Sequence, residues 1–288
     1  MGISNITLTA GMRANLFSMQ TTQKLMEQTQ TRLATGLKVL SALDHPINFF
    51  AAQGHQQRAG DLSDRKDGMG EAVQTVQAAN NGIEAVTTLI EAAKSLANSA
   101  LSADTTTEAS NLGVQFNAIL DQIDTMAADS GYKGINLMGG TGVSLEVKFD
   151  ETGDSKITLT GFNGSSGQAG SGGLGISDAV TGAAATYWAD ASDISSGMIN
   201  AAIDDLDAAI TTLRSESKEL ASNLSVITTR QDFTTAMINT LQDGAANLVN
   251  ADMNEEGANM LMLQTRQSLA TTSLALASQA AQSVLRLF

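Results

Sequence analysis

The chain has 288 residues, of which 42% are hydrophobic and only 4% aromatic, with one proline and no cysteine. Its 16 basic and 30 acidic residues give a formal net charge of −14. This charge repels a phosphate backbone, and no run of Lys or Arg offers a local basic patch, so nucleic acid is not an expected partner. The absence of cysteine excludes disulfides, thiolate metal sites and thiol catalysis. The scarcity of proline favours long helices over a compact α/β enzyme.

The first half of the sequence predicts three helices. Apolar residues recur in three-four steps over about 9–40, about 47–100 and about 108–129. The first two helices are separated by Asp44-His45-Pro46, because proline is tolerated where a helix begins but not inside it. The third helix is expected to end at the Gly-containing stretch 130–134.

The middle of the chain changes from helical periodicity to alternation. Val143, Leu145, Val147 and Phe149 alternate with polar residues, and a turn-forming stretch and a second apolar run follow, which predicts a β-hairpin. The segment 163–196 is rich in Gly, Ser and Ala, with Tyr187 and Trp188 as its large apolar groups. We therefore expect a solvated loop region there.

The second half gives the clearest helical signal. Apolar residues keep a three-four register from 199 to 248 and again from 260 to 288. At ~1.5 Å per residue the first of these helices would span roughly 75–80 Å, and other helices must cover its apolar seam. The predicted fold class is therefore mainly α: an elongated antiparallel helical bundle or coiled-coil rod with paired terminal helices and a small β-hairpin region.

Apolar side chains gather at both ends of the chain and predict a surface that is buried against a partner. If that partner is a second copy, an interface that does not close produces a helical polymer. The residues expected to form this polymerisation interface, along an inner wall, are Leu16, Met19, Leu33, Leu37, Leu269, Leu274, Leu276, Val284, Leu285 and Phe288.

The ends of the chain do not predict a membrane protein. Gln279, Gln282 and Arg286 interrupt the apolar tail, which disfavours a transmembrane span. The N-terminal residues lack the basic segment and apolar core of a secretory signal, so export would use a route without a cleaved signal peptide.

A catalytic constellation is not found, and no catalytic, cofactor-binding or metal-binding residue is predicted. His45 and His55 belong to no HExxH pattern, and the Gly-rich stretch lacks the ending of a phosphate loop. The acidic pairs Asp204-Asp205 and Glu255-Glu256 lie about 100° apart on a helix and are interpreted as solvated faces. We expect a protein that is not an enzyme and needs no cofactor.

Five motifs in order along the chain resemble those of bacterial flagellins. The front motif, Arg32-Leu33-Ala34-Thr35-Gly36-Leu37, is similar to the family's Arg-Leu-Ser-Ser-Gly-Leu, and Asp44 keeps the acidic position that follows it. The other four motifs are Gln77-Ala78-Ala79-Asn80-Asn81-Gly82-Ile83, Tyr132-Lys133-Gly134-Ile135-Asn136-Leu137-Met138, Ala246-Asn247-Leu248-Val249-Asn250-Ala251-Asp252-Met253 with Asn259-Met260, and the segment 273–285.

The resemblance implies a structural subunit that self-assembles into the bacterial flagellar filament for swimming motility, outside the cell. It implies an inner terminal-helix domain of 1–43 with 246–288, a helical rod domain of 44–162 with 197–245, and a short variable outer loop region, 163–196. Implied partners are further copies, a flagellar export chaperone, the filament cap and hook-associated junction proteins. The alternatives are a hook-filament junction protein of the same family and a non-flagellar coiled-coil scaffold.

One segment departs from the family pattern. Where many flagellins carry Leu-Gln-Arg-Ile-Arg-Glu-Leu, this chain has Ile90-Glu91-Ala92-Ala93-Lys94-Ser95-Leu96. Ala92 removes one planar guanidinium and Lys94 replaces the other with a point charge. The departure argues against recognition by the vertebrate Toll-like receptor.

Overall fold

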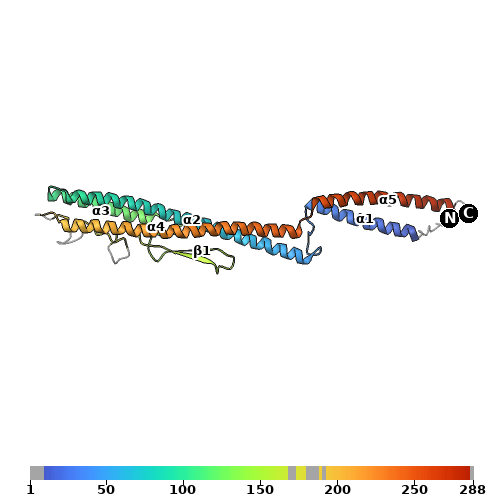
Figure 1. Ribbon diagram of the computed structural model, residues 1–288, viewed down its shortest axis with the longest axis horizontal. Helices are drawn as coiled ribbons and strands as arrows, with labels where there is room; N and C mark the ends of the chain where they lie inside the picture. The colour runs from blue at the N-terminus through green and yellow to red at the C-terminus, as the bar shows by residue number, and fades with distance from the viewer. Residues whose placement is uncertain (1–9, 168–172, 180–187, 190–192, 286–288) are drawn as a thin grey trace. The chain divides into compact units, whose positions relative to one another are not determined.

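The computed structural model describes residues 10–167, 173–179, 188–189 and 193–285, and these fold into helices with one two-stranded sheet (Figure 1). The elements are α1 (Ala10–Thr35), α2 (Pro46–Leu101), α3 (Thr106–Asp129), β1 (Ser144–Lys148), β2 (Lys156–Thr160), α4 (Ser196–Val249) and α5 (Met253–Leu285). The mainly α fold with a small hairpin is confirmed. The first helix ends at Thr35, before the predicted position 40.

The chain divides into two compact units. Unit 1 comprises Met1–Gln57 with Thr240–Phe288, and unit 2 comprises Arg58–Asn239. The predicted domain organisation divides the chain at other positions and stays a prediction.

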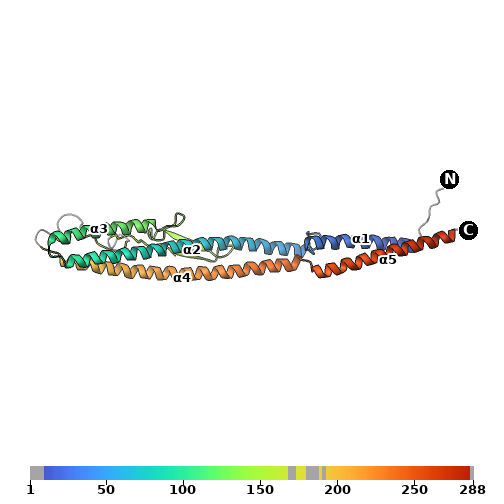
Figure 2. The ribbon, with the colours of Figure 1, turned by 90° about the horizontal axis from the view of Figure 1, so that it is seen from above.

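Unit 1 is built on the pairing of the two terminal helices, which lie side by side in both views (Figures 1 and 2). Side-chain contacts cross the pair from Asn15 to Ser273, from Gln23 to Gln267 and from Arg32 to Glu256. Residue numbers rise along α1 as they fall along α5, so the helices are antiparallel. The predicted pairing of the terminal segments is therefore present within one chain.

The front motif ends α1 and joins the two linkers of unit 1. Gly36 has φ 73° and its N–H donates to the Arg32 carbonyl at 2.8 Å, which is a helix C-cap that favours glycine. The amide of Lys38 donates to the Val249 carbonyl at 2.7 Å, and the amide of Ala251 donates to the Gly36 carbonyl at 2.9 Å. The α1–α2 and α4–α5 linkers are thus hydrogen-bonded to each other.

The acidic residue after this motif has a structural role. Asp44 Oδ2 accepts hydrogen bonds from the backbone amides of Ser41 and Leu40, at 3.0 and 3.1 Å. These amide donors lower the pKa of the Asp44 carboxyl below its ordinary value. The carboxylate therefore fixes the turn that leads to Pro46 and α2.

Unit 2 has one continuous hydrophobic core under α2, α3 and α4, which Figure 2 shows side by side. Ser217 on α4 donates to the Asn80 side chain on α2 at 2.9 Å, and Lys94 pairs with Asp207. These contacts make α2 and α4 antiparallel. The largest fully buried side chains include Met69, Ile90, Phe116, Leu120, Ile123, Leu206 and Leu213.

The motif after α3 forms a compact turn. Lys133 and Gly134 adopt positive φ angles of 50° and 83°. The Asn136 side-chain amide donates to the carbonyls of Ala127 and Ala128 at 2.8 and 2.9 Å, which satisfies the end of α3. The following Leu137 and Met138 are buried in the core of unit 2.

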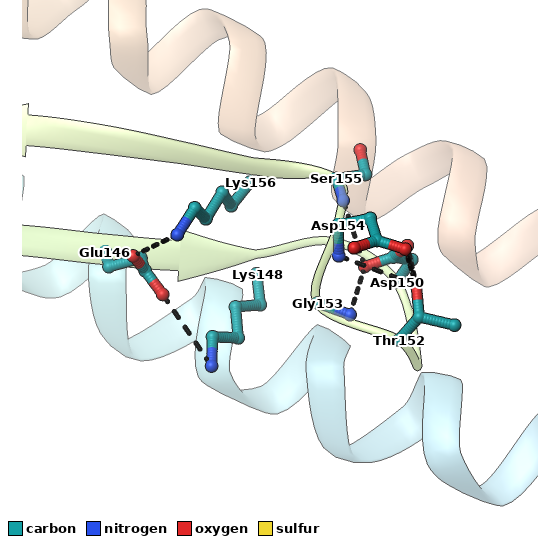
Figure 3. Close-up of polar contacts among 8 residues, drawn as sticks. All are labelled: Glu146, Lys148, Asp150, Thr152, Gly153, Asp154, Ser155 and Lys156. Carbon is teal, nitrogen blue, oxygen red and sulfur yellow. Dashed lines mark hydrogen bonds and ion pairs between the residues drawn. The ribbon is translucent and has the colours of Figure 1, made fainter.

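The hairpin is antiparallel, and its register pairs Leu145 with Leu159 and Val147 with Ile157. Val147 and Leu159 are buried. Glu146 accepts from Lys156 at 2.7 Å and lies 3.6 Å from the Lys148 ammonium (Figure 3). The predicted hairpin is confirmed, with its inner face on the core of unit 2.

A single carboxylate organises the tip of the hairpin (Figure 3). Asp150 Oδ1 accepts from the amides of Gly153 and Ser155 at 2.8 and 3.2 Å, and Oδ2 accepts from the Thr152 hydroxyl at 2.7 Å. Gly153 has φ 82°, a conformation that glycine adopts without steric cost.

This turn is expected to loosen in acid. The Thr152 hydroxyl and the backbone amides lower the pKa of Asp150 below its ordinary 3.8. A lowered folded-state pKa gives stability that is present above 3.8 and is lost as the pH falls through the lower folded value. NMR of the Gly153 amide during acidification should show this transition, and Asp150→Asn should remove it. An unchanged transition in the variant would contradict the assignment.

The segment 163–196 differs from the predicted solvated loop. Of its described residues, Leu174, Ile176 and Trp188 are buried in the core of unit 2. The Trp188 ring lies 4.7 Å from the Phe116 ring, centroid to centroid. The expectation of solvent exposure was wrong at these positions because a few large apolar groups dock on α3. Tyr187 lies outside the described residues.

Candidate self-assembly interface

The terminal helices meet along a seam with coiled-coil spacing. The seam side chains are buried or half-buried and recur in alternating steps of three and four. They are Met12, Asn15, Met19, Thr22, Met26, Thr29 and Leu33 on α1, and Glu256, Met260, Leu263, Gln267, Ala270, Leu274 and Ala277 on α5.

The seam is only partly apolar. Asn15, Thr22, Thr29 and Gln267 occupy positions where a stable two-helix coiled coil would carry Leu, Ile or Val. The Thr22 hydroxyl donates to the Ser18 carbonyl at 2.9 Å, so this buried group is satisfied within its own helix. Little apolar area is available to hold the pair together without further neighbours.

The predicted interface residues separate into two groups. Met19, Leu33 and Leu274 are half-buried in the seam. Leu37 is half-buried in the linker, where it pairs with Asn250. The structure does not bring Leu16, Leu269 and Leu276 into the seam.

Leu269 and Leu276 belong to an apolar stripe on the outer face of α5, together with Met262. Met262, Leu269 and Leu276 are seven residues apart, and Leu269 and Leu276 are 67% and 62% exposed. This outer stripe runs about 120° around the helix from the seam, at ~100° per residue. On α1, the exposed apolar residues are Leu16, Phe17 and Leu25. Phe288 and the side chains of Val284 and Leu285 lie outside the described residues.

A buried ion pair lies at the linker end of the seam. Arg32 Nη1 is 2.9 Å from Glu256 Oε1, and the Glu256 side chain is almost fully buried. The interpretation of Glu255-Glu256 as solvated was therefore wrong for Glu256. Glu256 precedes Met260 by four residues and therefore lies on the seam. This spacing could have predicted its burial from the sequence. Removing Arg32 would leave a buried carboxylate without its cation, which typically costs ~3 kcal/mol or more.

The described residues give no sign of a metal site or a membrane span. Within the described ranges, no group of three or more His, Cys, Asp or Glu could hold a metal ion. None of the helices described is long and apolar enough to cross a membrane. His45 Nδ1 accepts from the Asn48 amide at 3.2 Å, a local bond at the start of α2.

Comparisons with known proteins identify the family. The bacterial flagellin N-terminal helical region matches residues 3–142, and the bacterial flagellin C-terminal helical region matches residues 202–288. The chain is 26% identical to flagellin FljM of Caulobacter vibrioides over 289 residues, covering 100% of both chains. It is 25% identical to a flagellin of Brucella melitensis over 279 residues, covering 95% of each.

Among solved structures, a Bacillus cereus flagellin matches with a TM-score of 0.45 and 14% identity, covering 58% of this chain and 88% of that one. The two family matches together span most of the sequence and include all five motifs. The chain therefore belongs to the bacterial flagellins and is a subunit of the bacterial flagellar filament.

Proposed function

We propose that this flagellin polymerises through the outward apolar faces of its terminal helices, which form an inner wall of the filament. Of the residues predicted for this wall, Leu16, Leu269 and Leu276 lie on the exposed faces, while Met19, Leu33 and Leu274 lie in the seam behind them. The prediction also includes Leu37 in the linker, and Val284, Leu285 and Phe288. The observation that carries the proposal is the outer stripe of α5, where large apolar side chains remain exposed after α1 has packed on the seam.

Two physical arguments support this assignment. Burying a Leu side chain contributes about 1.5–3 kcal/mol, and a stripe repeated in every copy adds this gain throughout a polymer. The seam itself holds Thr22 and Thr29 where larger apolar groups would fit. The α1–α5 pair is therefore expected to be weak in the monomer and to become stable when neighbours cover it.

Limited proteolysis tests the proposal. Trypsin cleaves after Arg13, Lys24 and Arg266, which are exposed on the terminal helices. We expect rapid cleavage there in the monomer and protection in the filament, because opening of a weak helix pair exposes its backbone. Cleavage after Arg214 and Lys218 serves as the internal control, because both residues are exposed on α4 and not on the terminal helices. Equal cleavage of the terminal helices in monomer and filament would refute an interface on them.

The remaining roles belong to the same proposal. The inner domain of 1–43 with 246–288 would form the wall, the rod domain of 44–162 with 197–245 would surround it, and 163–196 would lie outermost. Export would proceed without a cleaved signal peptide, assisted by an export chaperone and the filament cap, and hook-associated proteins would join the filament to the hook. The protein would act mechanically, without catalysis or a cofactor.

The segment that resembles the Toll-like receptor epitope lies on α2. Ala92 is exposed on α2, whereas Lys94 is paired with Asp207 of α4. The cation that remains in this segment is therefore already engaged within the chain. This pairing supports weakened recognition by the receptor.

A further inference from the structure

Methionine is the only sulfur-containing residue of this chain, and it is concentrated in unit 1. The sequence has twelve methionines and no cysteine. Seven of the twelve lie in the 106 residues of unit 1, and five lie in the 182 residues of unit 2. Because the chain has no thiol that would react first, oxidants act on the methionine thioethers.

Four of these methionines lie on the seam between α1 and α5. Met12, Met19 and Met26 follow one another at intervals of seven residues and form one row of the seam on α1, and Met260 lies on α5. The other seam positions of α1 over this stretch carry Asn or Thr. These four residues, here called the seam methionines, therefore supply most of the large apolar groups with which α1 meets α5.

The seam methionines occupy space that α5 leaves open. Hydrogen bonds on both sides of Met19 join α1 to Gln267 and Ser273 of α5. Ala270 lies midway between those two residues, so the long thioether of Met19 lies opposite a methyl group. The unbranched and flexible side chain of methionine suits such a gap, provided that it stays apolar.

The seam thioethers are more accessible than those of the core. Met19, Met26 and Met260 are half-buried in the single chain. Met69 and Met138, in the core of unit 2, are 0% and 1% exposed. Opening of the weakly apolar helix pair exposes the seam further, whereas the core of unit 2 opens only when that unit unfolds.

We propose that the seam methionines are an oxidation site that controls whether the monomer assembles, and that the reagent is a two-electron oxidant such as hydrogen peroxide. The thioether sulfur attacks one oxygen of the peroxide, the O–O bond breaks, and a sulfoxide and water form. Sulfur is oxidised by two electrons and the peroxide is reduced. A sulfoxide at Met19 would be buried opposite the Ala270 methyl, which offers no hydrogen-bond donor. Oxidation of the monomer therefore opposes the pairing of α1 with α5. The proposal rests on the proposed interface of the terminal helices.

Peptide mass spectrometry measures the reaction at each site. In the monomer treated with hydrogen peroxide, the seam methionines should be oxidised about tenfold faster than Met69 and Met138, because local opening precedes unfolding of unit 2. Seam methionines that react as slowly as these two core residues would overturn the proposal.

A leucine variant tests the effect on assembly. Met12→Leu, Met19→Leu, Met26→Leu and Met260→Leu together keep the seam apolar and remove its sulfur. Peroxide treatment of the wild-type monomer should raise the critical concentration for polymerisation about tenfold, and that of the variant should change little. Met262→Leu is the matched control, because it removes an exposed sulfur on the outer stripe and should stay sensitive. Equal sensitivity of the seam variant and the wild type would overturn the proposal.

Reversal of the reaction uses the wild-type chain alone and so does not depend on folding of the variant. Methionine sulfoxide reductases A and B, which act on the two sulfoxide epimers, should restore polymerisation of the oxidised monomer. Polymerisation that stays lost after the seam sulfoxides have been reduced would overturn the proposal. Filaments built from chains with seam sulfoxides would also overturn it while leaving the outer stripe in the interface. Failure of that interface itself is read separately, on untreated Leu269→Asp.

Discussion

Leu269→Asp is expected to abolish filament formation while leaving the monomer folded. Leu269 is 67% exposed within the chain, so its replacement removes little internal packing. In a polymer that covers the outer stripe, the new carboxylate would be desolvated without a partner, at a cost of at least ~3 kcal/mol in every copy. Electron microscopy and sedimentation should show no filaments, and circular dichroism of the monomer should match that of the wild type.

A neighbouring position provides the matched control. Ser268 is exposed on the same helix but lies about 100° from Leu269, on neither the seam nor the outer stripe. Ser268→Asp adds the same charge and should still polymerise, whereas Leu276→Asp should fail like Leu269→Asp. Normal filaments from Leu269→Asp would remove the outer stripe from the interface. Equal failure of the Ser268 and Leu269 variants would show that added charge, and not the stripe, prevents assembly.

The helices could be predicted from the sequence because their apolar period is long and their ends carry strong local signals. Pro46 begins α2, and a glycine-containing turn follows α3. The hairpin could also be predicted from the sequence, because apolar and polar residues alternate on both sides of its turn. The end of α1 was missed because Leu37 and Leu40 continue the apolar spacing. Gly36 with its positive φ was the signal that the helix stops.

The choice between the two faces of α5 could not be made from its sequence. Leu274 belongs to the seam, while Leu269 and Leu276 belong to the outer stripe, yet all fit a three-four pattern. A helix rich in Ala, Leu and Met offers several such patterns, and the partner helix decides which one is buried. The partner α1 presents Thr22 and Thr29 to its seam, residues that a search for apolar periodicity passes over.

The prediction of a solvated loop at 163–196 was wrong for a related reason. Its average composition is polar and rich in glycine, which favours a solvated loop. A few large groups nevertheless determine where a segment docks, because each buries far more area than its neighbours. Trp188 packs against Phe116 with the two rings tilted, and Ile176, in the same segment, is also buried. The same single tryptophan provides a fluorescent probe for the core of unit 2.

Two glycines of α2 are expected to respond in opposite directions to the same substitution. A Cβ at Gly82 would lie 2.6 Å from Ser130 Cβ and 2.7 Å from Met138 Sδ, so Gly82→Ala forces the turn after α3 away from the helix. Overpacking of this kind typically costs ~1–3 kcal/mol. A Cβ at Gly60 would meet nothing within 4 Å, so Gly60→Ala should stabilise the helix by about 0.5–1 kcal/mol.

The free energy of unfolding of the two variants should therefore differ by about 1.5–4 kcal/mol, with the wild type between them. Urea denaturation followed by Trp188 fluorescence and by circular dichroism measures both, because Gly60, Gly82 and Trp188 all belong to unit 2. If Gly82→Ala were as stable as Gly60→Ala, the close approach of α2 to Ser130 would be absent in solution. The presence of glycine at position 82, in the second family motif, would then not be explained by packing in unit 2.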